Sequence, residues 1–455
     1  MKSKFTLLLL PLVISGCISL EPKYQKPENV IPTEFNNYGD TENKVVVPDD
    51  LFWKNYVQNE KLKKVIDLAL INNKDLSIAL SNIEVSRAKY GIEKSNRIPN
   101  VSLDYTGQKG KAENEIDNAK LDVTMTSYEL DIFGRVKNLS KSALEEYLNT
   151  EESRNAKEIL IRSEVIKAYY DIAYYKSALE ISINTENSTY SNLNLVQKRL
   201  DNGLSKEKDL NDAKSLYFKS KSERLMYQTN IEKSINALNY LVGEKIPDNF
   251  LPKNVKELNN SIKDIKQSFD SEVLLNRPDI LSAEHILKSK NANIGAARAA
   301  FFPRISLTAS SGIASNDLSA LFNSNYNTWG IIPNISIPIF DAGKNKSNLE
   351  VSKAEKDIAL KTYEQTLQKA FYEVLDELAI KSNIGERIYS YDNFIKANKK
   401  SYELANKSYE LGVSSYLEVL IAQQNLYNAE IQDLSLKREE FYNKISLYKV
   451  LGYWL

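Results

Sequence analysis

The chain holds one histidine, His285, and one cysteine, Cys17, so few of its side chains could carry catalytic or metal chemistry. His285 lies in the helical pattern ILSAEHILKSKNA, and no second His or Cys exists to share a metal ion with it. The sequence also lacks a glycine-rich phosphate or dinucleotide pattern and a nucleophile elbow. These features argue against an enzyme, a metal site or a cofactor, and they leave His285 a packing or surface role.

Cys17 has a different use, because it ends a secretory signal. Residues 1–17 read MKSKFTLLLLPLVISGC, with a basic start and an apolar run too short to span a membrane as a helix. The final ISGC resembles the bacterial lipobox, which implies cleavage before Cys17 and acylation of its sulfur and new amino group. The alternative is an ordinary signal peptide with an incidental Cys. Several acyl chains would anchor the chain firmly, and the Ile after Cys17 favours the outer membrane.

The remaining composition limits the partners and the kind of fold. Sixty basic residues balance sixty acidic ones, so the chain has no net charge whose electrostatic field would attract nucleic acid. Glycine and proline are sparse, with 15 and 12 copies in 455 residues, which favours long uninterrupted elements. Residues 18–50, rich in Pro, Asn and Glu, are expected to form an extended tether.

Landmark residues recur at nearly one offset, which indicates a tandem duplication. The pairs are Pro99 and Pro303, Phe133 and Phe340, Gly203 and Gly412, and Gly243 and Gly452, with offsets of 204, 207, 209 and 209. A period this long excludes a short solenoid repeat. The sequence therefore predicts two similar halves, 51–250 and 251–455.

Each half is expected to contain a β-hairpin, over 100–132 and 304–339. Strict alternation of apolar and polar residues follows Pro99 and Pro303. The phase slips at Ser127, where a β-bulge would restore it. These strands are about 9 to 11 residues long, enough to cross a hydrocarbon core when tilted. If any part of the chain spans a membrane, these hairpins do.

A long helix is expected after each hairpin, over about 136–199 and 344–409, where no proline occurs. Some 64 helical residues would span roughly 95 Å. Each helix should end at a glycine turn, at 200–205 and 409–415, from which a shorter helix returns. The helix before the hairpin and the returning helix together match one long helix in length. Each half would therefore supply two staves, that is, two parallel rods of a helical wall: one continuous helix, and one composite of two helices placed end to end.

The strand count then requires an assembly. Four strands cannot close a membrane barrel, which needs about eight, and an open edge in lipid leaves backbone groups unsatisfied. Two or three chains must share one sheet.

Four segments carry a specific resemblance: YELDIFGR (128–135), ISIPIFDAG (335–343), RLDNGLSKEKDLNDA (199–213) and YELGVSSYLEVLIAQ (409–423). They resemble the outer membrane factors of the TolC, OprM and CmeC type, the NodT-like efflux lipoproteins of tripartite systems with an RND-type inner membrane pump. The resemblance covers nearly all of the mature chain. It implies a mainly α fold with a transmembrane β part: a trimeric α/β-barrel duct with four β-strands and four helical staves per chain.

The expected functional residues fall into two groups. The strands should line a wet lumen with Asp104, Thr106, Asp122, Thr124, Asn334 and Ser336. Candidates for aromatic girdles at the membrane interfaces, with ordinary packing as the alternative, are Tyr105, Tyr128, Trp329 and Phe340.

The resemblance implies that the two turns dock a periplasmic adaptor and close the duct at rest. The docking residues would be Gly203, Leu204, Ser205, Gly412, Val413 and Ser414. Asp209, Asp212 and Glu418 would form rings of acids under threefold symmetry, as a gate or a cation-selective ring. The alternative is a capping role, with a capping box from Ser415 to Glu418. The family has an acid where Ile421 stands and a base where Ser414 stands, which weakens a salt-bridge lock.

The resulting expectation is a lipid-anchored homotrimer in the outer membrane of a Gram-negative bacterium, extending into the periplasm. It would be the passive channel-tunnel of a multidrug efflux pump and would need neither cofactor nor nucleic acid. Its partners would be an adaptor, an inner membrane RND pump and outer membrane lipid. The alternatives are a type I protein secretion duct and a lipoprotein that tethers envelope layers as a coiled coil without a channel.

Overall fold

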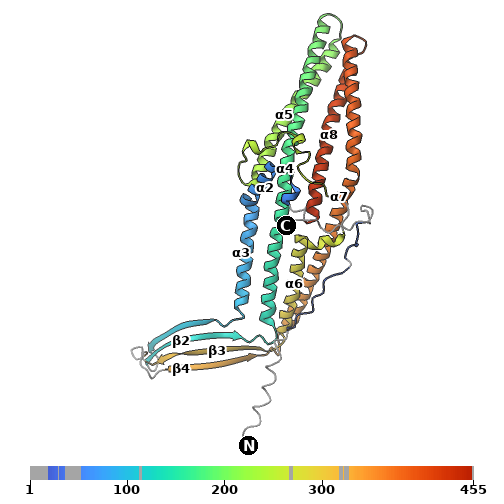
Figure 1. Ribbon diagram of the computed structural model, residues 1–455. Helices are drawn as coiled ribbons and strands as arrows, with labels where there is room; N and C mark the ends of the chain where they lie inside the picture. The colour runs from blue at the N-terminus through green and yellow to red at the C-terminus, as the bar shows by residue number, and fades with distance from the viewer. Residues whose placement is uncertain are drawn as a thin grey trace. The chain divides into compact units, whose positions relative to one another are not determined.

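The computed structural model describes residues 19–28, 30–35, 53–111, 115–265, 270–316, 321 and 327–452. Its elements are, in chain order, α1 (Trp53–Tyr56), α2 (Glu60–Asn72), α3 (Lys74–Ser95), β1 (Val101–Lys111), β2 (Glu115–Glu129), α4 (Arg135–Asp201), α5 (Glu207–Val242), η3 (Asp248–Phe250), η4 (Val255–Leu258), η5 (Ser271–Asn276), α6 (Pro278–Ala299), β3 (Arg304–Ser315), β4 (Asn327–Ser336), α7 (Lys344–Glu410) and α8 (Tyr416–Val450). Figure 1 labels most of them.

The contacts within the chain define two compact units, and each unit draws on both halves of the sequence. Unit 1 takes Met1–Val30, Leu80–Ser153 and Asp279–Thr366. Unit 2 takes Ile31–Ala79, Arg154–Pro278 and Leu367–Leu455. Both hairpins belong to unit 1 and both helix turns belong to unit 2. The long helices α4 and α7 contribute residues to both units.

Unit 1 contains one antiparallel sheet in the order β1-β2-β3-β4, in which the two predicted hairpins lie side by side (Figure 1). Residues directly opposite each other share a face of a sheet. Leu103 faces Val123, whereas Asp104 faces Asp122, so the register places apolar and polar residues on opposite faces. β1 and β4 are the edge strands among the described residues.

The bulge expected at Ser127 is confirmed. The register between β2 and β3 shifts between Met125 and Tyr128, and Ser127 has a φ of 50°. The amide of Ser127 donates a hydrogen bond to the side chain of Thr308 at 3.1 Å, which satisfies a group that the ladder leaves out. The left-handed residue lets β2 keep its apolar face on one side beyond the bulge.

Each hairpin in unit 1 passes into a long helix through the same aspartate cap. Asp131 accepts hydrogen bonds from the amides of Val136 and Lys137, at 3.1 and 2.6 Å. Asp341 accepts hydrogen bonds from the amides of Gly343 and Asn345, at 3.0 and 2.9 Å. An acceptor at a helix N-terminus satisfies donors that have no partner within the helix. This repetition of the cap agrees with the duplication in the sequence.

The helix lengths also repeat. α4 and α7 have 67 residues each, and the returning helices α5 and α8 have 36 and 35. In unit 2 the continuous and returning helices pack through aromatic side chains. Tyr170 of α4 stacks on Phe441 of α8 with ring centroids 3.9 Å apart. In the described part of the chain, no helix is long and apolar enough to cross a membrane.

Candidate functional sites at the helix turns and the strands

The two turns of unit 2 have the same backbone geometry. Gly203 ends α4 and Gly412 ends α7, with φ values of 71° and 76°. After each glycine, the next amide donates back into the helix: Leu204 to the carbonyl of Arg199 at 2.8 Å, and Val413 to that of Ser408 at 2.9 Å. This is the glycine-terminated reversal that the sequence predicts at both positions.

Three apolar side chains project into solvent from these turns. The exposed fractions are 73% for Leu204, 71% for Leu411 and 80% for Val413. Ser205 and Ser414 are half-buried beside them. Exposed aliphatic side chains grouped on a surface are typical of a contact site for another protein. The structure thus places four of the predicted docking residues at the turns with the two glycines, and it adds Leu411.

A small apolar core joins the two turns within unit 2. It buries the side chains of Val196, Leu210, Ala213, Tyr409, Tyr416 and Val419. The Tyr409 and Tyr416 rings lie 5.5 Å apart, on opposite sides of the second turn. Because the helices on both sides of each turn contribute to this core, it holds the two turns together in the single chain.

Arg199 adds a polar contact between the same two turns. Its guanidinium lies 4.4 Å from the centre of the Tyr409 ring, and it donates a hydrogen bond to the Tyr409 carbonyl at 2.6 Å. A cation over an aromatic face is attracted by the electron density of the ring. This pair is absent from the residues predicted from the sequence. The signal available was an Arg and a Tyr that precede the paired turn glycines by four and three residues.

Three buried hydroxyls near the second turn have no hydrogen-bond partner among the described residues. They belong to Tyr409, Tyr416 and Ser414. Burial raises the pKa of Tyr416 well above its ordinary value, and the neighbouring Tyr409 adds to the increase. Tyr416 therefore stays neutral, and its contact with Tyr409 is one of ring packing.

The three candidate acids have different environments. Asp209 accepts hydrogen bonds from the Lys206 amide at 3.2 Å and the Ser205 hydroxyl at 3.0 Å, which caps α5. Asp212 forms an ion pair with Lys208 at 2.6 Å, and the hydrogen bond of this pair raises the pKa of Lys208. Asp209 thus already has the local capping role that was the alternative to a gate.

The capping box expected from Ser415 to Glu418 is wrong. The Ser415 side chain makes no hydrogen bond with the backbone of α8. Its hydroxyl instead donates to the Glu418 carboxylate at 3.4 Å. Glu418 remains exposed, and Ile421, one turn further along α8, is half exposed.

The strand residues of unit 1 occupy the expected faces. On the polar face, Asp122 is 5% exposed and forms an ion pair with Lys120 at 2.5 Å. On the other face, Tyr105 is 57% exposed and Trp329 79%, while Phe340, past the end of β4, is 90% exposed. Tyr128 differs, because it is half-buried and its hydroxyl donates to the Arg97 carbonyl at 3.3 Å.

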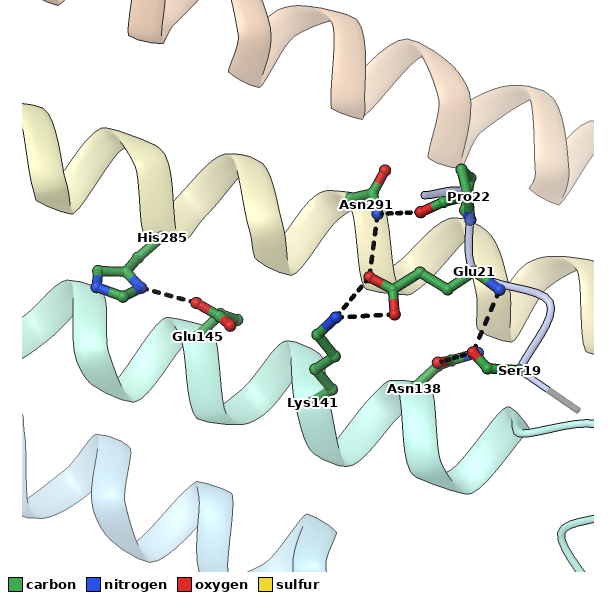
Figure 2. A network of polar contacts seen from close by, with 8 residues as sticks. All are labelled: Ser19, Glu21, Pro22, Asn138, Lys141, Glu145, His285 and Asn291. Atoms are coloured by element: carbon green, nitrogen blue, oxygen red, sulfur yellow. Dashed lines mark hydrogen bonds and ion pairs between the residues drawn. The ribbon is translucent and has the colours of Figure 1, made fainter. Parts of the chain in front are cut away.

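Cys17 and His285 are the two residues that could carry thiol or imidazole chemistry. Cys17 lies outside the described residues. His285 of α6 places Nδ1 2.7 Å from a carboxylate oxygen of Glu145 in α4, within unit 1 (Figure 2). A group of three or more His, Cys, Asp or Glu residues that could hold a metal ion is not found in the part of the chain that the structure describes.

Comparison with known proteins agrees with this arrangement. A family model described as "Outer membrane efflux protein" matches residues 65–244 and 271–453. The solvent efflux pump outer membrane protein SrpC of Pseudomonas putida is 37% identical, over 99% of this chain and 98% of SrpC. The cation efflux system protein CusC of Escherichia coli K12 is 34% identical over 97% of both chains.

Solved structures show the same fold. A crystal structure of CusC matches with a TM-score of 0.87 and 34% identity, over 95% of this chain and 99% of CusC. The open state of the Neisseria gonorrhoeae MtrE outer membrane channel matches with a TM-score of 0.87 and 32% identity, over 95% and 98%. The expected fold class, a mainly helical channel protein with a β part, is confirmed.

Proposed function

Because the chain belongs to the outer membrane efflux protein family, we propose that it is the passive exit duct of a tripartite efflux pump, assembled as a homotrimer. The chain supplies walls and contacts and carries out no catalysis. The observation that supports this most directly is the four-stranded sheet of unit 1, whose edge strands β1 and β4 each pair on one side only among the described residues.

An edge strand in lipid would leave a row of backbone groups without hydrogen bonds, each at a cost of several kcal/mol. If β1 of one chain pairs with β4 of the next, the edges disappear. Three chains then give about 12 strands, enough for a closed barrel with an aqueous interior. The polar face with Asp104, Asp122 and Thr124 would line that interior, and the face with Leu103, Val123 and Trp329 would contact lipid.

Whereas the strands are suited to contact with lipid, the helix turns are suited to contact with proteins outside the membrane. Leu204, Leu411 and Val413 offer a compact apolar surface on two turns that a shared core holds together. We assign this surface to a periplasmic adaptor, which would link the duct to an inner membrane pump of the RND type. Acylated Cys17 would add the lipid anchor on the periplasmic side of the outer membrane.

The exported compounds are chosen by the pump in this scheme. SrpC is named for solvent efflux and CusC for cation efflux, although both share about a third of this sequence. The duct itself therefore requires only a wet, wide lumen. A type I secretion role is the narrower alternative within the same architecture.

Two measurements test the proposal. The purified chain, reconstituted in planar bilayers, should give steady pore conductance and run as a trimer that heating converts to monomer. Deleting the chain should raise the intracellular accumulation of dyes, detergents and antibiotics. A monomer without conductance would contradict the duct and favour a tether, and normal accumulation with lost export of a protein substrate would favour secretion.

A further inference from the structure

A polar groove lies between α7 and α8 within unit 2. Its volume is about 460 Å³, within the range of cavities that hold small organic molecules. Glu377 and Ile380 of α7 form one wall. The other wall comes from α8, where Ser435, Tyr442 and Ser446 follow each other at the spacing of one helix face. None of these side chains belongs to the helix turns or to the strands.

Asn443 of α8 holds the Glu377 side chain in place at this groove. The Asn443 amide donates to a carboxylate oxygen of Glu377 and to the Glu377 backbone carbonyl, both at 2.7 Å. Asn443 is only 3% exposed, so this amide is fixed between the two helices. The Ser446 side chain also forms a hydrogen bond with the carboxylate. The carboxylate therefore has a defined position in the wall of the groove.

The other charged side chains that line the groove already have partners. Arg438 forms an ion pair with Asp171 of α4, with Nε and Oδ1 2.7 Å apart. Glu439 forms an ion pair with Arg387 at 2.7 Å. Glu377 has no ion-pair partner among the described residues. The groove thus contains one carboxylate whose charge is not balanced by a contacting cation.

Burial has the largest effect on this carboxylate. It raises the pKa of Glu377 above its ordinary value, and the neighbouring charge of Asp376 adds to the increase. The hydrogen bonds of Asn443 and Ser446 and the charge of Lys167 in α4 act in the opposite direction without cancelling it. The charged form of Glu377 is therefore destabilised by its surroundings, and a cation that enters the groove would stabilise it.

The available oxygens suit an ammonium group better than a metal ion. Calcium and magnesium ions prefer six or more oxygen ligands, usually with several carboxylates. A group of three or more His, Cys, Asp or Glu residues that could hold a metal ion is not found in the described part of unit 2. An ammonium group has three N–H donors, and one carboxylate with the Ser435 and Ser446 hydroxyls can accept them. Ile380 offers an apolar contact beside these oxygens.

We propose that the groove between α7 and α8 binds a small organic cation, with its ammonium group at the Glu377 carboxylate and its apolar part against Ile380. Asn443 is a positioning residue, because it acts on the ligand through Glu377. The inference goes beyond the exit duct, since the groove lies within one chain. Because α7 and α8 are the helices on either side of Gly412, a bound cation would add a contact between them.

Binding is tested with the purified full chain and benzylammonium as the probe, in a calorimetric titration at about pH 8, where carboxyl groups are ionised. Benzyl alcohol is the matched probe, because it has nearly the same shape without the charge. We expect saturable binding of benzylammonium and binding of benzyl alcohol that is weaker by about tenfold or more. Absence of benzylammonium binding, or equal affinities for the two probes, would overturn the proposal.

Glu377→Gln tests the carboxylate itself, because it removes the charge and keeps an oxygen for the Asn443 amide. We expect the affinity for benzylammonium to fall about 10- to 100-fold in this variant. Glu386→Gln makes the same change of charge at an exposed position of α7 outside the groove, and it should bind as the native chain does. Equal affinities of the two variants would show that the probe binds elsewhere.

Two measurements on the native chain need no variant. Since the pKa of Glu377 is raised, benzylammonium binding should begin to weaken at a pH above 4.5, the ordinary value. The charged neighbours that would act on this titration are Lys167 of α4, Asp376 of α7, and Arg438 and Glu439 of α8. Binding that does not change with pH would exclude Glu377 as the partner of the cation.

Magnesium chloride provides the second measurement. At matched ionic strength it should displace benzylammonium no better than sodium chloride does, since a single carboxylate is a poor site for a divalent metal ion. Specific displacement by magnesium would replace the organic cation by a metal ion and overturn the proposal. A chain that binds benzylammonium as expected but gives no pore conductance would contradict the exit duct and leave this inference standing.

Discussion

The side-chain amide of Asn73 donates a hydrogen bond to the carbonyl of Leu241 at 2.7 Å, within unit 2. Its oxygen accepts a hydrogen bond from the Leu76 amide at 3.1 Å. One side chain thus caps the start of α3 and the end of α5, which joins two helices from distant parts of the chain end to end. In the second repeat Arg277, directly before α6, donates to the carbonyl of Val450 at 2.6 Å. The composite staves expected from helix lengths have these junctions as their physical basis.

We predict that Asn73→Ala lowers the free energy of unfolding by about 1–3 kcal/mol, because it removes the cap and leaves the Leu241 carbonyl without this donor. Chemical denaturation followed by circular dichroism measures the loss. Asn96→Ala is the control, since among the described residues that exposed side-chain amide donates to the neighbouring Glu93 and to no distant element. Equal effects of the two substitutions would contradict the role given to Asn73.

The glycines that end α4 and α5 should differ in their tolerance of a side chain, although their backbones are alike. Gly203 and Gly243 have φ values of 71° and 82°. A Cβ at Gly203 meets nothing within 4 Å, whereas a Cβ at Gly243 would lie 2.7 Å from the carbonyl oxygen of Asn72. We expect Gly203→Ala to cost about 1 kcal/mol from the left-handed backbone alone, and Gly243→Ala to cost clearly more in the same unfolding measurement. Similar losses would show that the backbone around Asn72 moves freely.

Arg199→Gln should loosen the two turns, because it removes the charge over the Tyr409 ring, worth about 1–2 kcal/mol in a partly buried site. The expected result is a higher resting leak conductance in planar bilayers. Tyr409→Phe should keep the native leak, since the lost hydroxyl has no hydrogen-bond partner among the described residues. Lys198→Gln, one residue away, serves as the control for a simple change of charge. An unchanged leak conductance in Arg199→Gln would show that the contact between Arg199 and Tyr409 does not help to close the duct at rest.

Asp209 can be tested for charge and for capping separately. Asp209→Asn keeps an acceptor for the Lys206 amide but removes the charge, whereas Asp209→Ala removes both. If a ring of acids acts in the duct, Asp209→Asn with Glu418→Gln should raise the leak and reduce cation selectivity. If capping is the role, only the alanine variant should change, through a loss of stability of about 1 kcal/mol. Bilayer ion selectivity and thermal unfolding distinguish these results.

Glu284 of α6 gives unit 1 a specific acid sensitivity. Burial alone would raise its pKa, but the hydrogen bond and ion pair with Lys288 and the ion pair with Lys26 bring the pKa below its ordinary value. A lowered pKa in the folded chain stabilises it above the unfolded pKa of 4.5, and this contribution disappears as the pH falls through the folded value.

Accordingly, Glu284→Gln should destabilise the chain by about 1–2 kcal/mol at neutral pH, and the difference should shrink and then vanish as the pH falls below 4.5 and through the lowered pKa of the folded chain. Unfolding followed at several pH values checks this. A difference that persists in acid would mean that packing, and not charge, is responsible.

The amino-acid sequence by itself determined the local elements of this protein. Alternation predicted the hairpins and the bulge at Ser127, and Gly203 and Gly412 predicted the turns, because these features depend on neighbours a few residues apart. The duplication allowed each feature to be recognised twice.

Only the tertiary structure decided which distant side chains meet. Arg199 and Tyr409 are 210 residues apart, and Lys141 and Glu21 are 120 apart. The periodicity of apolar and polar residues carries no information on such pairs, since any polar residue at a position predicted to be exposed fits that periodicity. The same limit explains the wrong capping box at Ser415, because the direction of a serine side chain is not contained in the sequence pattern. In the described part of the predicted tether, for example, Glu21 contacts α4 and Leu20 contacts α6 within unit 1.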